Sequence, residues 1–212
     1  MSTAPIEFPP PVDSGKEFVG PPTDPEDERI EVGVAIVGAG PAGLACAIRL
    51  GQLLEDAPAV AERLGEVPVA VIEKGKQPGS HLLSGAVVNP RALQRLFAGR
   101  KRLDEMPFYG PVEQESVYFL TSNRAVRIPT PPTMKNHGNR VASLAELGRW
   151  LAEQAEEAGA IILPETAATR LLVDHGRVRG IRTGDKGRGK NGEELANFEP
   201  GSDVTARVTV LS

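Results

Sequence analysis

The chain has only one cysteine, Cys46, among its 212 residues. A single thiol excludes an internal disulfide, and it excludes any metal cluster that draws several cysteine ligands from this chain. Cys46 falls in a segment with helical spacing, on the side that we expect to pack against the rest of the domain. We therefore predict a buried structural thiol rather than a reactive one.

The sequence also lacks an excess of positive charge and a long uninterrupted apolar run. Its formal net charge is −4 and its pI is about 5.5, which argues against nucleic acid as a partner. The longest run without charge, residues 32–48, contains glycines and a proline, so it predicts a buried strand and helix rather than a membrane span. The first residues lack the basic and apolar regions of a secretory signal.

The most informative stretch begins with a strand and a glycine-rich turn. Residues 32–37 form a β-branched, apolar run typical of a strand buried on both faces. Gly38, Gly40 and Gly43 follow in the spacing G-x-G-x-x-G. In a dinucleotide site the first glycine makes the tight turn, the second lets a pyrophosphate approach the backbone, and the third lets the helix pack on the strand. The alternative is a tight strand–helix turn without a ligand.

A helix is expected to begin at this turn. Pro41 suits the first helical position, where no N–H is needed. The free N–H groups of a helix N-terminus favour phosphate. The predicted cofactor-binding residues of this turn are Gly38, Gly40, Pro41, Ala42 and Gly43.

An acidic residue closes the second expected strand, residues 67–72. Glu73 stands where a carboxylate accepts hydrogen bonds from an adenosine ribose, and we include Lys74 in the cofactor-binding set. The usual spacing from the glycines is about 20 residues, whereas Glu73 lies 30 residues beyond Gly43. We expect the excess, residues 55–66, to lengthen the helix and add an excursion around Pro58 without moving the strand.

The rest of the chain divides into a tail, a loop, an insertion and a meander. We expect residues 1–30 to be disordered and residues 31–212 to form one domain with an inserted strand and loop region at about 104–142. Asn89 and Pro90 favour a short helix through Phe97, and Ser143 with Glu146 forms a capping box for a helix through about Ala158. Strands are expected at residues 116–120, 124–128, 160–163, 169–173, 177–181 and 204–211.

This order predicts an α/β fold. After the second strand come a loop rich in glycine and serine, an insertion and a three- or four-stranded meander. NAD dehydrogenases continue instead at this point with further alternating strands and helices of one sheet. We therefore predict a Rossmann-like FAD/NAD(P)-binding domain of the glutathione-reductase type, the two-dinucleotide-binding-domain fold, with a β-meander and incomplete at its C-terminus. An NAD-only dehydrogenase is the less favoured alternative.

Longer motifs make a family resemblance specific. They are VAIVGAGPAGLACAIRL, VIEKG, GSHLLSGAVVNPRALQRLF and RIPTPPTMKNHGNRVASLAELGRWLAEQAEEAGA. From about Glu31 to Ser212 the chain resembles the N-terminal part of the electron transfer flavoprotein–ubiquinone oxidoreductases. Other members of this flavoprotein superfamily, such as geranylgeranyl reductase-like or Fix-type oxidoreductases and flavin monooxygenases, remain alternatives, as does a non-catalytic truncated nucleotide-binding module.

The resemblance implies a relay in which electron transfer flavoprotein gives electrons to FAD and a [4Fe–4S] cluster, and ubiquinone takes them. It places Gly79, Ser80, His81 and Ser84 towards the flavin, with Asn136, His137 and Gly138 as weaker candidates; it identifies no catalytic residue. It also implies peripheral membrane contact near residues 93–102. The basic residues there otherwise fit a solvated helix end.

Two departures from the family qualify these expectations. The cluster cysteines have no counterpart, so we expect the [4Fe–4S] cluster only outside this chain. The sequence stops at the strand that leads to a second FAD contact in the family, so we expect a fragment that does not reduce quinone alone. The expected location is the cytoplasmic face of a bacterial inner membrane, with the mitochondrial inner membrane as the alternative.

Overall fold

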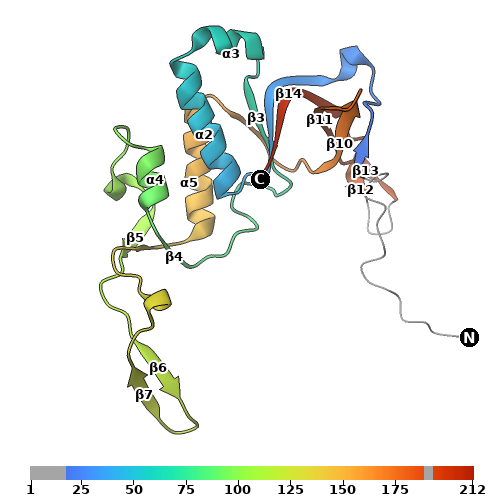
Figure 1. Cartoon of the computed structure of the whole chain (residues 1–212). Helices are drawn as coiled ribbons and strands as arrows, with labels where there is room; N and C mark the ends of the chain where they lie inside the picture. Colours follow the sequence, from blue (N-terminus) through green and yellow to red (C-terminus); the bar gives the residue numbers. More distant parts are fainter. Residues whose placement is uncertain (1–17, 189–192) are drawn as a thin grey trace, which may run out of the picture.

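The computed structural model describes residues 18–188 and 193–212, and its centre is a mixed seven-stranded sheet (Figure 1). The strand order is β1-β10-β11-β14-β2-β3-β9. In that order the strands are Val19–Gly20, Ala168–Asp174, Arg177–Thr183, Asp203–Leu211, Ile30–Val37, Val69–Ile72 and Ile161–Leu163. Strands β14, β2, β3 and β9 are parallel, whereas β10, β11 and β14 form an antiparallel meander. The predicted α/β fold is therefore confirmed.

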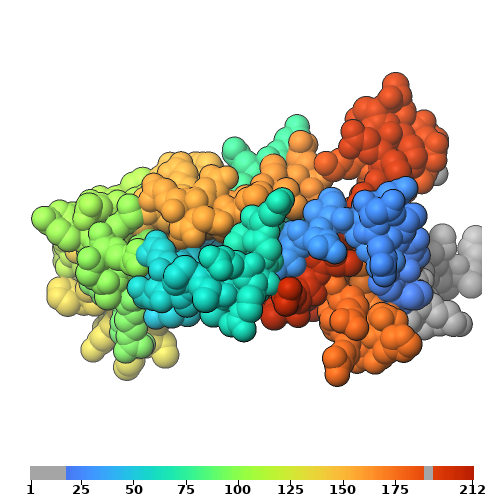
Figure 2. All heavy atoms as spheres, turned by 90° about the horizontal axis from the view of Figure 1, so that it is seen from above, coloured from blue at the N-terminus to red at the C-terminus, as the bar shows by residue number. Residues whose placement is uncertain are grey.

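Two helices cover one face of the parallel strands. Helix α2 (Pro41–Glu55) and helix α5 (Leu144–Glu157) lie side by side over the sheet in both views (Figures 1 and 2). Ile36 and Val71 from the sheet pack with Leu44 and Leu151 from the helices in one core. The opposite face forms a second core with the meander, which includes Ile181. Both faces of β2 and β3 are thus buried, as their apolar sequences require, at about 1.5–3 kcal/mol per large side chain.

Cys46 is exposed, so the prediction of a buried thiol is wrong. The buried residues of α2 are Gly43, Leu44, Ala47, Ile48, Gly51 and Gln52. They recur three or four positions apart and define one face. Since an α-helix has about 3.6 residues per turn, Cys46 falls on the opposite face.

Part of the expected disordered tail is ordered. Residues 1–17 lie outside the described residues, but residues 18–29, here called the N-terminal strap, cross the meander. In the strap, β1 adds a parallel strand to β10, and a 3₁₀ turn follows at Glu26–Glu28. The proline and acid content of this segment predicted little burial, and it gave no sign that Asp24 pairs with Arg182 on the meander.

An ion-pair network fastens the N-terminal strap. The carboxylate of fully buried Asp203 accepts hydrogen bonds from the N–H groups of Thr23 (2.6 Å) and Asp24 (2.9 Å). Nη1 of Arg182 donates to the carboxylates of Asp203 (2.7 Å) and Asp24 (2.8 Å). Burial raises the pKa of Asp203, but hydrogen bonds from Asp24 N–H, Arg182 and Thr23 N–H outweigh it and hold that pKa below its usual value.

The segments around the parallel strands differ in detail from the expectations. Residues 55–66 do not simply lengthen α2; a separate helix, α3 (Pro58–Leu64), follows it. Strand β9 pairs with β3 in the parallel sheet rather than joining the meander. Ser143 Oγ accepts a hydrogen bond from Glu146 N–H (3.3 Å), while the Glu146 carboxylate accepts one from the Tyr109 hydroxyl (2.9 Å) instead of closing the capping box.

The inserted region lies at one end of the molecule (Figure 2). A short helix, α4 (Arg91–Leu96), precedes 3₁₀ turns at Leu103–Glu105 and Pro132–Met134. Three short strands form a sheet in the order β4-β8-β5, with bounds Ala86–Val88, Arg140–Ala142 and Phe108–Pro111. The predicted hairpin forms as β6 (Val117–Leu120) and β7 (Ala125–Ile128). A second hairpin, β12 (Lys186–Arg188) with β13 (Glu194–Glu199), leaves the meander.

No helix in residues 18–188 or 193–212 combines the length and apolar character needed to cross a bilayer. Within the same ranges, no group of three or more histidine, cysteine, aspartate or glutamate side chains is placed to hold a metal ion.

Candidate functional site

The glycine turn joins β2 to α2. Gly38 has φ +107°, a conformation that glycine adopts without strain. A Cβ atom on Gly43 would lie 2.1 Å from the Gly38 carbonyl oxygen, so only glycine lets the first turn of α2 approach so closely. Gly40 differs, because a Cβ atom there would meet nothing within 4 Å. The turn therefore has no room for a side chain at Gly43, whereas the space next to Gly40 is open.

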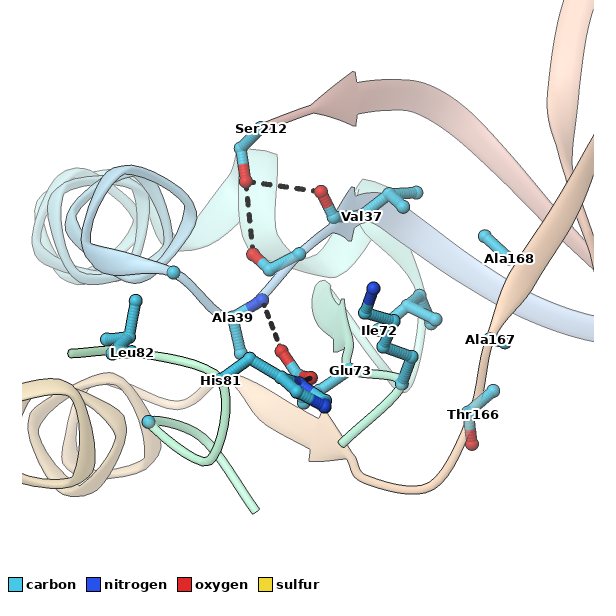
Figure 3. Close-up of a pocket in the computed structure, with 14 residues that line it drawn as sticks. Val37, Ala39, Ile72, Glu73, His81, Leu82, Thr166, Ala167, Ala168 and Ser212 are labelled. Carbon is cyan, nitrogen blue, oxygen red and sulfur yellow. Dashed lines mark hydrogen bonds and ion pairs between the residues drawn. The ribbon is translucent and has the colours of Figure 1, made fainter. Parts of the chain in front are cut away.

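A cavity of about 260 Å³ lies beside this turn, where the carboxyl ends of parallel strands meet (Figure 3). It is lined by Val37, Gly38, Ala39, Gly40, Ile72, Glu73, Lys74, Gly79, His81, Leu82, Thr166, Ala167, Ala168 and Ser212. We call it the strand-end pocket. Ligands of open α/β sheets bind at such edges, and the N-terminus of α2 adds a partial positive charge.

Glu73 connects two loops of the strand-end pocket. Its Oε2 accepts a hydrogen bond from Ala39 N–H (3.0 Å), and its Oε1 accepts one from Gly75 N–H (2.6 Å). The side chain is only 12% exposed. The carboxylate is therefore held against the glycine turn, and each oxygen keeps lone-pair capacity for a ligand hydroxyl.

His81 lies beside this carboxylate rather than at a separate end of the site. Its Nδ1 is 3.9 Å from Glu73 Oε1, and its side chain is 63% exposed. Gly75 makes the approach possible, since a Cβ atom there would lie 2.9 Å from Glu73 Oε1 and 3.0 Å from His81 Cε1. The flavin-side role expected for His81 stays a prediction.

The structure gathers only part of the predicted site. Six predicted residues line the strand-end pocket: Gly38, Gly40, Glu73, Lys74, Gly79 and His81. Gly43 is buried beneath the turn, and Ser80 and Ser84 are exposed and do not line the pocket. Pro41 and Ala42 face a different, apolar groove. The weaker candidates Asn136, His137 and Gly138 lie in the inserted region, where Asn136 N–H donates to Glu115.

The residues that the sequence did not predict include Thr166, Ala167 and Ala168. Their backbone is tied to the Glu73 loop, because Thr166 N–H donates to the Glu73 carbonyl (2.8 Å) and Glu165 N–H to that of Gly75 (2.9 Å). Assigning β9 to the parallel sheet would have revealed them, since the carboxyl ends of neighbouring parallel strands share one edge.

The region predicted to contact lipid turns its apolar side chains inward. Leu93 and Leu96 line the apolar groove against α2 and α5, and Phe97 is buried with its ring centroid 5.1 Å from that of Trp150. Arg100 pairs with Glu55 (2.7 Å) and Lys101 with Glu157 (3.7 Å), and Arg102 pairs with Asp104. These pairs fit the solvated helix end that the sequence favoured.

Comparison with solved structures supports the fold. A geranylgeranyl bacteriochlorophyll reductase-like protein from Thermoplasma acidophilum superposes with a TM-score of 0.56 at 19% identity, over 87% of this chain and 39% of that one. A myxobacterial chondrochloren halogenase, an FAD-dependent enzyme, gives 0.52 at 14% identity, over 86% of this chain and 37% of the other. The Rossmann-like architecture of FAD-dependent oxidoreductases is thus confirmed. No family model matches the chain.

Sequence comparison gives closer relatives. The mitochondrial electron transfer flavoprotein–ubiquinone oxidoreductase of Dictyostelium discoideum is 45% identical over 193 residues, which are 91% of this chain and 30% of the relative. A probable bacterial counterpart from Acinetobacter baylyi is 43% identical over 192 residues, 88% of this chain and 33% of the relative. The chain therefore spans about a third of the length of these relatives. The resemblance predicted from the motifs is confirmed: over nearly all of its length, this chain is related to one part of the electron transfer flavoprotein–ubiquinone oxidoreductases.

Proposed function

We propose that this chain is the FAD-binding part of an electron transfer flavoprotein–ubiquinone oxidoreductase, which passes electrons from electron transfer flavoprotein to ubiquinone. The observation that carries the proposal is the open face of Gly40 beside the Glu73 carboxylate, at the edge of the sheet where dinucleotides bind. The names of the relatives supply the two partners.

The residues present fit the adenosine diphosphate half of FAD. The backbone at Gly38, Gly40 and Ala42 would hold the pyrophosphate at the N-terminus of α2. Glu73, fixed by two backbone N–H groups, would bind the ribose, and Lys74 and His81 would border it. FAD supplies the redox chemistry when bound; the residues of this chain bind and orient it.

The iron–sulfur cluster does not fit this chain. A [4Fe–4S] cluster takes four cysteine ligands, whereas Cys46 is the only cysteine. The proposed cluster therefore belongs to a part of the full-length protein outside these residues, and so does ubiquinone reduction. We expect no electron transfer from reduced electron transfer flavoprotein to a quinone analogue by this chain alone.

The proposed setting is a membrane surface, the cytoplasmic face of a bacterial inner membrane or else the mitochondrial inner membrane. Lipid contact near residues 93–102 is part of the proposal. It would involve the exposed basic side chains, since Leu93 and Leu96 face the apolar groove.

A titration with FAD tests the binding proposal. Gly40 has φ −75° and open space around it, so Gly40→Val leaves the fold intact while its side chain enters the space proposed for the pyrophosphate. We expect the Kd for FAD to rise about 100-fold or more, equivalent to about 2.8 kcal/mol. Ala59→Val, at an exposed position of α3 that does not line the strand-end pocket, is the control with the same introduced side chain and retains affinity.

Two results would contradict this proposal. One is an unchanged FAD affinity in Gly40→Val; the other is a wild-type chain that binds NADH in preference to FAD. Thermal melting of both variants shows whether a loss of binding reflects a loss of folding.

A further inference from the structure

The hydroxyl of Ser212 reaches the glycine turn from the end of β14. Its Oγ lies 3.1 Å from the carbonyl oxygen of Val37 and 3.1 Å from that of Gly38, as the dashed lines of Figure 3 show. A hydroxyl has one hydrogen to donate, and the Val37 carbonyl also accepts the Ser212 N–H (3.0 Å). The Gly38 carbonyl, which lies beyond the last paired residues of the ladder, is therefore the acceptor that depends on the side chain.

Gly43 leaves the room that this hydroxyl needs. A Cβ atom on Gly43 would lie 2.5 Å from Ser212 Oγ as well as 2.1 Å from the Gly38 carbonyl oxygen. The hydroxyl therefore occupies a space at the start of α2 that any other residue at position 43 would fill. The end of β14, the glycine turn and the first turn of α2 thus meet around one hydroxyl.

The peptide bond between Gly38 and Ala39 links this hydroxyl to Glu73. The carbonyl of this peptide faces Ser212, while its N–H donates to Glu73 Oε2 at 3.0 Å. A trans peptide is planar, so its C=O and N–H point in opposite directions and turn together. Glycine sets few steric limits on the rotation of the plane that follows it. A bond that fixes the Gly38 carbonyl therefore also fixes the direction of the Ala39 N–H.

We propose that Ser212 is a positioning residue for ribose recognition. By holding the Gly38 carbonyl, it aims the Ala39 N–H at the Glu73 carboxylate and keeps that carboxylate in place for the ribose hydroxyls of a nucleotide. The inference rests on the proposed function for the role of Glu73. The other carboxylate oxygen of Glu73 has its own backbone donor, Gly75 N–H (2.6 Å). Loss of the Ser212 hydroxyl should therefore loosen one oxygen of the carboxylate and leave the other fixed.

Thr209 offers a matched control on β14. Its Oγ1 is buried and has no hydrogen-bond partner among the described residues, so its removal takes away no contact. Thr209→Val removes this hydroxyl and keeps the shape of the side chain, whereas Ser212→Ala removes the hydroxyl that reaches Gly38. The two variants therefore separate the loss of a hydroxyl from the loss of the bond to the turn.

Nucleotide binding by this chain gives the first readout. We compare ADP with its dideoxy analogue, which lacks both ribose hydroxyls. In Ser212→Ala we expect the Kd for ADP to rise about fivefold, the scale of one hydrogen bond, and the Kd for the dideoxy analogue to stay the same. Thr209→Val should change neither Kd. A general weakening of the site would instead affect both nucleotides.

Amide hydrogen exchange followed by NMR gives a second readout, which needs no ligand. We expect exchange of the Ala39 N–H to become about tenfold faster in Ser212→Ala, because its peptide plane is no longer held from the carbonyl side. The Gly75 N–H, which donates to the other oxygen of Glu73, is the internal reference and should keep its exchange rate. Thr209→Val should leave both amides as in the wild type.

Three results would overturn the inference. They are an unchanged Ala39 exchange rate in Ser212→Ala, an equal acceleration of the Ala39 and Gly75 amides, and a Kd for ADP that changes no more than that for its dideoxy analogue. A wild-type chain that binds neither FAD nor ADP contradicts the proposed function instead. The exchange rate of the Ala39 amide then decides alone whether Ser212 holds the turn.

Discussion

The strand-end pocket and the β6–β7 hairpin are built from similar residues but in opposite settings. Ile36, Val71 and Ile72 next to the pocket are almost completely buried, whereas Val126 and Ile128 of the hairpin face water. The pocket region has both faces of its strands covered within this chain. The difference teaches that similar apolar residues are buried where sheet, helices and meander cover a strand on both faces, and stay exposed in the β6–β7 hairpin, which joins neither core of the described residues.

The largest expected effect is at the glycine turn. Gly43→Val would place its Cβ atom 2.1 Å from the Gly38 carbonyl oxygen and 2.5 Å from Ser212 Oγ, so β2 and α2 would have to separate. We expect a loss of about 3 kcal/mol or more in the free energy of unfolding. Urea denaturation monitored by circular dichroism measures it, with Gly40→Val as the control that should unfold like the wild type.

Removing the carboxylate under the N-terminal strap should be nearly as costly. Asp203→Ala leaves Arg182 and the N–H groups of Thr23 and Asp24 without their buried acceptor. We expect a loss of about 2–3 kcal/mol and faster proteolysis of residues 18–29. The exposed Asp27→Ala is the control; an equal effect of both substitutions would show that the strap contributes no stability through Asp203.

The same substitution in the two regions sharpens the comparison. Val71→Thr adds a hydroxyl to a fully buried strand position, and Val126→Thr adds one to an exposed strand position. We expect a cost of about 1–3 kcal/mol at Val71 and less than about 0.5 kcal/mol at Val126 in this chain. Comparable costs at both sites would mean that the hairpin is buried after all.

The smallest effect is the acid dependence of the N-terminal strap. The pKa of Asp203 is lowered in the folded protein, so its ionisation stabilises the fold above the ordinary aspartate pKa of about 3.9. This stability is lost as the pH falls through the lower folded-state pKa. The difference in unfolding free energy between wild type and Asp203→Ala should therefore narrow from pH 7 to about pH 3. A constant difference would argue that hydrogen bonding to the uncharged acid is sufficient.

Local signals in the sequence predicted most of the fold. The glycine turn and the Ser143 cap depend on residues close together in the chain. Short apolar runs on either side of a turn at Ser122 and Asn123 placed β6 and β7 to within one residue. Strands β4, β5 and β8, of three or four residues each, carry no comparable signal, so the sheet they form was not predicted.

Pairing between distant segments was the main gap. The sequence of residues 161–163 is compatible with both a meander and a parallel strand, and only its partner β3 decides between them. Because of this ambiguity, Thr166 and its neighbours were not included in the predicted site. The order of the N-terminal strap was missed for the same reason, since the N–H groups of Thr23 and Asp24 donate to the Asp203 carboxylate about 180 positions away in the sequence.

The position of β2 at the middle of the sheet bears on how the protein is made. One neighbour of this early strand is β3, but the other is β14, which begins only at Asp203. At about 5–20 residues per second, β2 waits on the order of ten seconds or more for that neighbour. During this time one edge of an almost entirely apolar strand is open to other nascent chains. Chaperone binding at residues 30–37 is therefore expected to be an ordinary step in the biogenesis of this domain rather than a response to damage.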